Sequence, residues 1–102
     1  MILIQKDGNM MMFEVYDVDL NPVVIISPDA MNRNLRTVIV APLTHTIKGY
    51  PSRVPLDFND QRGEVVLDQI RAVDKSRLIK KKGRIDAATA TNIKMVLKTM
   101  FS

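Results

Sequence analysis

The stretch VDLNPVVIIS, residues 18–27, constrains the fold more than any other part of this sequence, because two strand-like runs meet there with only Asn21-Pro22 between them. Asn-Pro is a turn signal, but the connection of a hairpin normally holds a Gly or several polar residues. Pro22 fixes its own φ and pushes Asn21 toward extended backbone. The chain must therefore either turn an abrupt corner at Asn21-Pro22 or continue as one long strand over residues 12–27.

Most of the remaining chain consists of short runs rich in β-branched and aromatic residues, which favour strands. Asp7-Gly8 suits a tight turn, so residues 1–11 allow an extra N-terminal hairpin strand. The apolar run VVIIS is typical of a central, buried strand, and Pro42 indicates an edge or a bulge near the end of RTVIVAPL. The predicted strands are ILI, MMMFEVYDV, VVIIS, RTVIVAPL, SRVPLDF, EVVLDQIRAVD, which is the longest β pattern, and IKKKGRI.

Three segments predict helices. In SPDAMNRN, Ser27 can cap a short helix and Pro28 fits its first position, and in DKSRL the residue Asp74 can cap a single turn. From Asp86 onward, DAATATNIKMVLKTMF carries apolar residues at helical spacing and lysines on the opposite face. The sequence therefore predicts a mainly β domain, a mostly antiparallel sheet with one C-terminal amphipathic α-helix.

Length and composition exclude several classes of protein. A chain of 102 residues is expected to form a single domain, residues 1–102. Because it has no cysteine and a single histidine, His45, we expect no disulfide, no metal site and no cofactor. No apolar run approaches the ~20 residues of a membrane span, so the cytoplasm is the simplest location. The net charge of +4 is compatible with a polyanionic partner but identifies none.

The segment APLTHTIKGYP places threonine hydroxyls, His45 and Lys48 close together at the end of a strand. Hydroxyls and a cation there can hold a phosphate, and a histidine can move protons near neutral pH. The alternative is a polar loop whose threonines satisfy backbone groups, with His45 exposed and without a role. Spacing alone favours that alternative.

Two other groups of charges have both a structural and a functional interpretation. Asp68 falls inside the apolar pattern VVLDQIR, where a carboxylate must be paired or solvated, and Arg71 would lie on the opposite face of a regular strand. Asp68 is then either paired with another cation for structural reasons or a carboxylate of a site. In IKKKGR, solvated surface charge is the ordinary interpretation and phosphate contact the alternative.

Taken together, these segments resemble the MazF/PemK (Kid-type) family of toxin ribonucleases. The resemblance rests on PVVIISPDAMN (22–32), TVIVAPLTHTIKGYP (37–51) and VVLDQIRAVDKSRLIKKKGRID (65–86), followed by the C-terminal helix, in the order and spacing of the family. It implies a small SH3-like β-barrel with a C-terminal helix, usually a homodimer. It also implies a metal-independent endoribonuclease, an mRNA interferase that cuts single-stranded RNA and leaves 2′,3′-cyclic phosphate and 5′-hydroxyl ends. The other implied partner is a MazE/PemI-like antitoxin whose acidic tail occupies the RNA groove.

The resemblance also implies site residues at matching positions. Thr44 matches the threonine whose hydroxyl would bond the scissile phosphate, and Asp68 and Gln69 match groove positions. Relatives carry small residues where this chain has His45, so no role is transferred to it by the resemblance. The candidate catalytic residues are Thr44 and Asp68, and the candidate RNA-binding residues are His45, Lys48, Gln69 and Arg71.

One departure from the family pattern affects the chemistry. Relatives usually carry a polar loop that ends in an arginine directly before the proline, whereas this chain passes straight from Asn21 to Pro22. The missing arginine serves the family as acid/base or as transition-state cation, and Asn21 takes its place. A positioned proton-transfer group contributes about 10²–10⁴ in rate, so we expect weakened or lost cleavage. Lys6, Lys48 and His45 are the groups that could compensate.

Several alternatives follow from this departure. Another cation could preserve normal cleavage, or the chain could be a catalytically inactive module that sequesters antitoxin or RNA. The related gyrase-poison toxins share the barrel, but APLTH and VVLDQIR are typical of the ribonuclease branch. Because shortened hinges invite domain swapping, we also expect a homodimer with altered or exchanged N-terminal strands.

Overall fold

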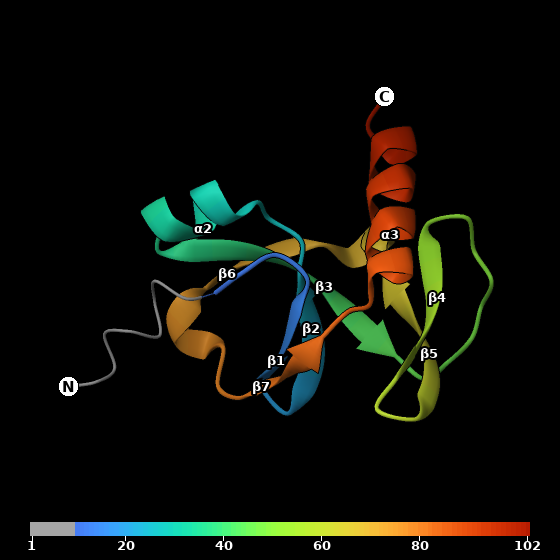
Figure 1. Cartoon of the computed structure of the whole chain (residues 1–102), viewed down its shortest axis with the longest axis horizontal. Coiled ribbons are helices and arrows are strands. Elements are labelled where there is room, and N and C mark those ends of the chain that lie inside the picture. Colours follow the sequence, from blue (N-terminus) through green and yellow to red (C-terminus); the bar gives the residue numbers. More distant parts are fainter. Residues whose placement is uncertain (1–9) are drawn as a thin grey trace.

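A single curled sheet of seven strands dominates the computed structural model, which describes residues 10–102 (Figure 1). Its strand pairs are all antiparallel within this range. The strands are β1 Glu14–Val18, β2 Asn21–Ile25, β3 Thr37–Thr44, β4 Arg53–Phe58, β5 Gln61–Val66, β6 Arg71–Asp74 and β7 Lys81–Arg84. The helices are α2 Asp29–Asn34 and α3 Ala87–Met100, and two 3₁₀ turns are η1 Leu67–Gln69 and η2 Lys75–Arg77. The predicted mainly β fold with a C-terminal helix is confirmed.

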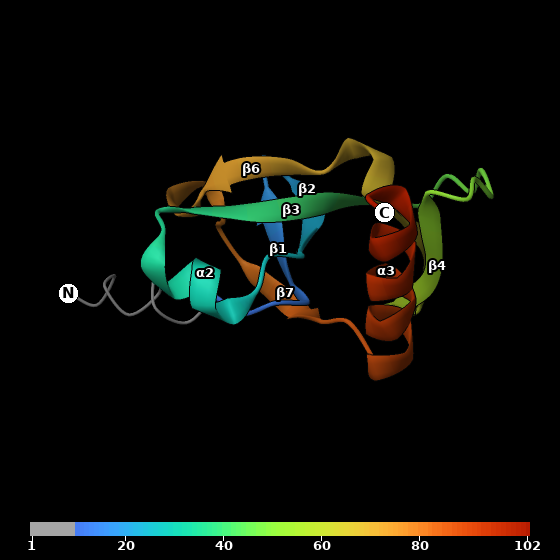
Figure 2. The same cartoon turned by 90° about the horizontal axis from the view of Figure 1, so that it is seen from above.

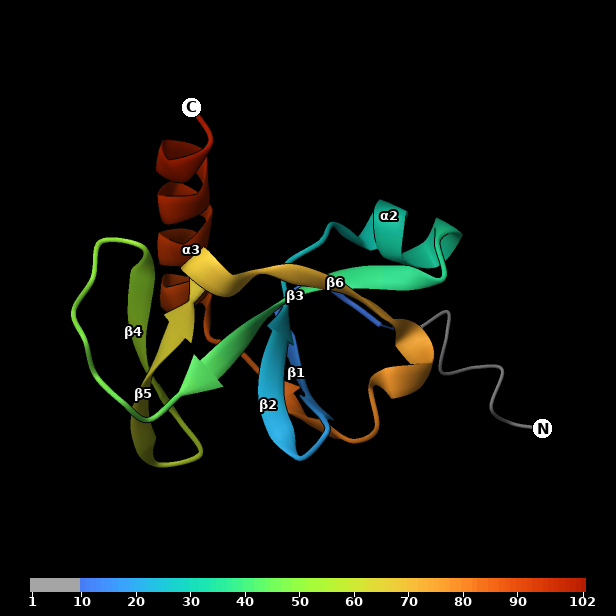
Figure 3. The ribbon, with the colours of Figure 1, turned by 180° about the vertical axis from the view of Figure 1, so that it is seen from behind.

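Strand β3 connects the two parts of the sheet. The strand order is β4-β5-β3-β2-β1-β7, and β6 pairs with β3 off this path. Val40 pairs with Ile25 of β2 on one edge and with Arg71 of β6 on the other. Pro42 is the last residue of β3 that pairs with β2, and the pairing with β5 begins at Leu43. The irregularity predicted at Pro42 therefore lies where β3 passes from one part of the sheet to the other, a path that Figure 3 shows from behind.

The middle of the sheet is buried on both faces, which explains why the run VVIIS has no polar alternation. Helix α3 packs on the first of two cores with Ile93, while α2 lies at the other end of the molecule (Figure 2). The first core holds Phe13, Val15, Val24, Ile26, Ala41, Val54, Leu56, Val65, Leu67, Ile85 and Ile93. The second core holds Met10, Tyr16, Val18, Val23, Ile25, Val38, Val40, Val73 and Leu78.

The connection between β1 and β2 is a tight hairpin turn of two residues, Asp19 and Leu20. Val18 pairs with Asn21, and the two residues between them have φ values of 52° and 70°, as a type I′ turn requires. The chain thus makes the abrupt corner, with Pro22 inside β2. The alternative of one long strand over residues 12–27 is wrong, and the closed hairpin removes the reason for expecting exchanged N-terminal strands.

The short helix α2 is confirmed, but its predicted cap is wrong. Helix α2 begins at Asp29, with Pro28 at the N-cap and no side-chain capping bond. The buried hydroxyl of Ser27 instead donates to Asn32 Oδ1 and accepts from the backbone N–H of Ile39 at 3.0 Å. Ser27 therefore joins α2 to β3, because a buried hydroxyl must find its partners inside the protein.

The longest predicted strand, EVVLDQIRAVD, is broken in the structure. β5 and β6 both pair along the same edge of β3, and the three residues of η1 loop out between them. This turn carries Asp68, which therefore does not lie inside a strand as predicted. Because of this interruption, β5 and β6 can both pair with one edge of β3, although they belong to different parts of the curled sheet.

The remaining elements follow the sequence signals. Asp74 caps η2 by accepting from Ser76 N–H at 2.9 Å, and Asp86 caps α3 by accepting from Thr89 N–H at 3.2 Å. Residues 1–9 lie outside the described part of the chain, so the extra N-terminal hairpin strand stays a prediction. Within residues 10–102, no helix has the length and apolar character needed to cross a membrane.

Candidate functional site

A pocket of about 470 Å³ lies where β3 ends, between the β1–β2 turn and the β4–β5 hairpin. Four separate segments supply its walls: the first hairpin, the end of β3 with the start of the following loop, the β4–β5 hairpin, and β7. The hydrophobic floor includes Leu43 and Leu56. The polar side chains that line it are Asp17, Asn21, Thr44, His45, Asn59, Gln61 and Lys82.

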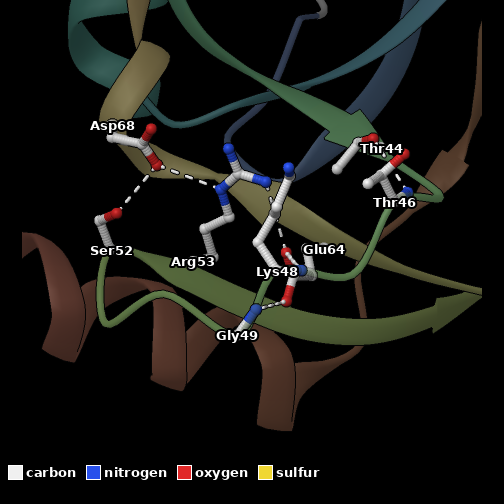
Figure 4. A network of polar contacts seen from close by, with 8 residues as sticks. All are labelled: Thr44, Thr46, Lys48, Gly49, Ser52, Arg53, Glu64 and Asp68. Atoms are coloured by element: carbon white, nitrogen blue, oxygen red, sulfur yellow. Dashed lines mark hydrogen bonds and ion pairs between the residues drawn. The ribbon is translucent and has the colours of Figure 1, made fainter.

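Thr44 ends β3 and lines the pocket. Its Oγ1 accepts a hydrogen bond from the backbone N–H of Thr46 at 3.1 Å (Figure 4). A hydroxyl that accepts in this way can still donate its own proton. Thr44 is therefore held in one orientation and can still bond an oxygen of a bound molecule.

The next residue, His45, also lines the pocket. Its Nδ1 lies 3.3 Å from the backbone carbonyl oxygen of Arg62, in β5. Behind it, β5 approaches β3 closely, since a Cβ built at Gly63 would lie only 2.4 Å from the carbonyl oxygen of Thr44. Glycine at this position allows the two backbones to meet and shapes the wall on which His45 sits.

The loop after β3 is held by one buried carboxylate, Glu64. Its Oε1 accepts from Lys48 N–H at 3.1 Å, and its Oε2 accepts from Gly49 N–H at 2.9 Å (Figure 4). These bonds, the one from Gly49 first, lower the pKa of Glu64 below its usual value. Arg53 adds a third contact, with Nη1 at 3.5 Å from Oε1. The loop is thus tied to β5 although it has no regular secondary structure.

Arg53 lies between two carboxylates and orders the surface next to the pocket. Besides Glu64, it contacts Asp68 through Nε at 3.4 Å, and its guanidinium lies 5.0 Å from the ring centroid of Tyr50. Asp68 also accepts from Ser52 Oγ at 2.9 Å, and this bond is the main cause of the lowered pKa of Asp68. The structural interpretation of Asp68, a salt bridge to a cation other than Arg71, matches this arrangement.

The structure brings together only part of the predicted site. Thr44 and His45 line the pocket, whereas Lys48 takes part in the loop through its backbone and has an exposed side chain. Gln69, the last residue of η1, and Arg71, the first residue of β6, are exposed and do not line the pocket. Of the groups proposed to replace the absent loop arginine, Lys6 lies outside the described residues and His45 alone lies in the pocket.

Sequence reasoning missed Arg53 and Glu64, and it considered Lys82 only as one residue of the basic run IKKKGR, with phosphate contact as the alternative to solvated surface charge. The turn Asn59-Asp60 could have located the first two, because a two-residue hairpin fixes the register so that Arg53 pairs with Val66 and is a diagonal neighbour of Glu64. Nothing local indicates Lys82, since only the pairing of β7 with β1 brings it to the pocket. Within residues 10–102, no cluster of three or more His, Cys, Asp or Glu side chains could hold a metal ion.

Comparison with known proteins finds one family model and one related protein that indicate the same family. The family described as "PemK-like, MazF-like toxin of type II toxin-antitoxin system" matches residues 14–101. The "Probable endoribonuclease MazF5" of Mycobacterium tuberculosis is 34% identical over 82 residues, which cover 76% of this chain and 75% of that protein.

Solved structures of mycobacterial proteins have the same fold. One is described as an "Endoribonuclease from Mycobacterial species", with a TM-score of 0.81, 31% identity and 89% of each chain covered. A second, an "Endoribonuclease in complex with its cognate antitoxin from Mycobacterial species", has a TM-score of 0.82, 30% identity, and covers 89% of this chain and 93% of that chain.

Proposed function

This chain belongs to the family of PemK-like, MazF-like toxins of type II toxin-antitoxin systems, and from this premise we propose that it is an endoribonuclease of single-stranded RNA. The observation that supports the proposal most is the pocket at the end of β3, where the oriented hydroxyl of Thr44 lies beside His45. Both the curated relative and the mycobacterial structures named above are described as endoribonucleases.

The chemistry is proposed to use the RNA itself as the nucleophile. The 2′-hydroxyl attacks the adjacent phosphorus, and the products carry a 2′,3′-cyclic phosphate and a 5′-hydroxyl. The Thr44 hydroxyl would donate a hydrogen bond to a non-bridging oxygen of that phosphate, where negative charge develops. A positioned donor of this kind contributes about 2.7–4 kcal/mol to lowering the barrier.

The short β1–β2 turn is expected to make the reaction slower than in relatives that carry a loop there. Asn21 lines the pocket at the position where the resemblance expects an arginine. An amide cannot supply the charge of a guanidinium. The loss of one proton-transfer group corresponds to about 10²–10⁴ in rate, so we propose reduced, rather than absent, cleavage.

The exposed residues Lys48, Gln69 and Arg71 are proposed to bind the rest of the RNA. Gln69 can bond a base edge, and Arg71 and Lys48 can contact phosphates. Asp68 would act on this surface through Arg53, which it holds in place. The basic chain, with its net charge of +4, suits this polyanion.

The same basic surface is proposed to bind an acidic MazE/PemI-like antitoxin. A mycobacterial endoribonuclease similar to this chain has been solved with its cognate antitoxin. The active assembly is proposed to be a homodimer, as the resemblance implies. Because the β1–β2 hairpin closes within one chain, the two subunits would dock as folded units.

A cleavage assay tests the proposed function. Purified protein is incubated with single-stranded RNA in the presence of a chelator, and 2′,3′-cyclic phosphate ends are measured. We expect cleavage that Thr44→Ala abolishes and that Thr46→Ala preserves, because the latter keeps the backbone N–H that bonds Thr44. Equal cleavage by Thr44→Ala and the unchanged protein would contradict the role of Thr44.

A second candidate function is sequestration of antitoxin or RNA without cleavage. It is favoured by Asn21, an uncharged amide that lines the pocket at the position where the resemblance expects an arginine. Under this alternative, the protein binds an acidic antitoxin segment or RNA tightly, and no cyclic phosphate forms even after long incubation. Measurable cleavage that depends on Thr44 rules this alternative out.

A further inference from the structure

We propose that Lys82 and His45 together replace the absent loop arginine, with Lys82 as the cation that stabilises the reacting phosphate and His45 as the base that removes the 2′-hydroxyl proton. This inference rests on the proposed ribonuclease function. It names the residues of the same pocket that stabilise the developing negative charge and accept the proton. It follows from residues that the fold, and not the sequence, brings together.

Lys82 reaches the pocket from a distant part of the chain. Strand β7 pairs with β1, with Val15 opposite Gly83 and Tyr16 opposite Lys81, and Lys82 lies at the irregularity between these two pairs, where its Nζ reaches Asp17 of β1. Among the described residues, Lys82 is the one Lys or Arg that lines the pocket. It therefore supplies the pocket with a positive charge that Asn21 cannot.

Within residues 10–102, the Lys82 side chain makes one ion pair, and this pair is loose enough to exchange for a phosphate. Its Nζ lies 3.5 Å from Asp17 Oδ2, and the two side chains remain 35% and 21% exposed. This distance is longer than the about 2.7–2.9 Å of a close ammonium–carboxylate hydrogen bond, and exposed pairs are worth only about 0–1 kcal/mol, so a phosphate oxygen can take the place of Asp17. Asp17 thus keeps Lys82 directed along the pocket wall in the absence of RNA without blocking its contact with RNA.

The contact of His45 fixes which of its ring nitrogens can act as a base. A carbonyl oxygen only accepts hydrogen bonds, so the contact with Arg62 requires the proton of the neutral ring to be on Nδ1. Nε2 is then unprotonated and carries the free lone pair. The side chain is exposed and lines the pocket next to Thr44, so this lone pair is accessible to a bound ribose.

The assigned step balances in atoms and protons. Nε2 of His45 accepts the proton of the 2′-hydroxyl while O2′ forms a bond to phosphorus. The bond between phosphorus and O5′ breaks, O5′ leaves with the electron pair, and it takes a proton from solvent. The imidazolium returns its proton to solvent, so the net proton count is unchanged. Lys82 remains protonated throughout and offsets the charge on the phosphorane oxygens, while Thr44 donates to one of them.

Variants of Lys82 test the charge. We expect Lys82→Gln to lower kcat by about 10²-fold, in the range of a lost transition-state contact, with a much smaller change in KM. Lys82→Arg keeps the charge and should retain most of the rate. Lys98→Gln, on the outer face of α3, removes the same charge far from the pocket and is the matched control. Lys82 is partly exposed, and thermal unfolding checks that each variant is folded.

Imidazole rescue tests the base. His45→Ala should lose about 10²–10⁴ in rate, and added imidazole should restore part of that rate, because the cavity left by an exposed side chain is open to solvent. A merely structural histidine would give no rescue. The same additions to Thr44→Ala should restore nothing.

The outcomes separate this inference from the function on which it rests. If the unchanged protein cleaves RNA and Thr44→Ala does not, but Lys82→Gln equals Lys98→Gln or His45→Ala is not rescued, the assignment fails and the ribonuclease function stands. If the unchanged protein does not cleave RNA at all, the function fails and the assignment fails with it.

Discussion

Leu20 occupies a backbone conformation that suits glycine. Its φ is 70° and its side chain is 92% exposed, so no packing offsets the strain of about 1–2 kcal/mol that a left-handed residue carries. We expect Leu20→Gly to raise the free energy of unfolding by about 0.5–1 kcal/mol, after the extra entropy of glycine in the unfolded chain. Urea unfolding measures the change. Leu35→Gly, at a residue with a φ of −117°, is the control and should lower stability.

Glu64 is expected to make the loop after β3 sensitive to acid. Because its pKa is lowered in the folded protein, the folded state binds fewer protons than the unfolded state in the range between the two pKa values. The stabilisation is therefore complete above about pH 4.3, the usual glutamate value, and is lost as the pH falls through the lowered pKa. Thermal unfolding between neutral and acidic pH should show this loss.

Glu64→Gln provides the comparison. The variant should unfold at a lower temperature at neutral pH, since an amide oxygen accepts the bonds from Lys48 and Gly49 more weakly than a carboxylate. Its stability should also depend less on pH than that of the unchanged protein. Asp57→Asn removes a carboxylate from an exposed pair with Arg62 and should have almost no effect. Identical pH profiles for Glu64→Gln and the unchanged protein would show that Glu64 does not hold the loop.

At the scale of elements, the junction of β3 and β5 depends on Gly63. A Cβ there would lie 2.4 Å from the carbonyl oxygen of Thr44, and neither backbone can move without disturbing the pairing of Leu43 with Val65. We expect Gly63→Ala to cost about 1–3 kcal/mol, as overpacking does, and to reduce cleavage by displacing Thr44. Calorimetry and the cleavage assay measure the two effects.

Gly49→Ala is the contrasting variant for that prediction. Gly49, unlike Gly63, has a positive φ, 69°, and no atom lies within 4 Å of a Cβ built there. Gly49→Ala should therefore lower the free energy of unfolding only by the backbone strain that it introduces, about 1–2 kcal/mol. The pairing of β3 with β5 should stay intact. If both variants lose the same stability and the same activity, close approach is not what Gly63 provides.

Patterns of local sequence predicted most elements but not their connections. The caps at Asp74 and Asp86 and the buried run VVIIS depend on neighbouring residues, so their signals lie in the sequence itself. Ser27 was wrongly assigned as a cap because its partner Ile39 comes from the next strand. The break at η1 could not be seen, because Leu67–Gln69 carries no Gly or Pro and lies inside the long β pattern EVVLDQIRAVD, and only the pairing of both β5 and β6 with β3 forces it to loop out.

The candidate site could be predicted only where it is continuous in the sequence. Thr44 and His45 are adjacent and end a strand, so the sequence placed them together. Lys82 required the pairing of β7 with β1, which no periodicity reveals. Asp68 was read as lying in a strand, and its partner Arg53 was missed because their contact crosses from β4 to η1.

At the scale of the whole molecule, the net charge of +4 should make RNA binding sensitive to salt. For single strands, the slope of log K against log salt is about −0.7 for each phosphate contacted. If Arg71 contacts a phosphate, Arg71→Gln should reduce the slope by about that amount. Lys98→Gln, on the outer face of α3, should leave it unchanged. Titrations of RNA at several salt concentrations measure these slopes. Equal slopes for Arg71→Gln and the unchanged protein would show that Arg71 does not contact a phosphate of the RNA.

The pocket draws on the chain from Asp17 to Lys82, and its last wall comes from β7, directly before α3. A nascent chain on the ribosome folds from its N-terminus, and the first hairpin needs only its own two strands. The remaining wall is missing until the C-terminal part has left the exit tunnel. We therefore expect a growing polypeptide to have no ribonuclease activity until β7 has emerged and paired, and fragments that end before β7 should be inactive in the cleavage assay.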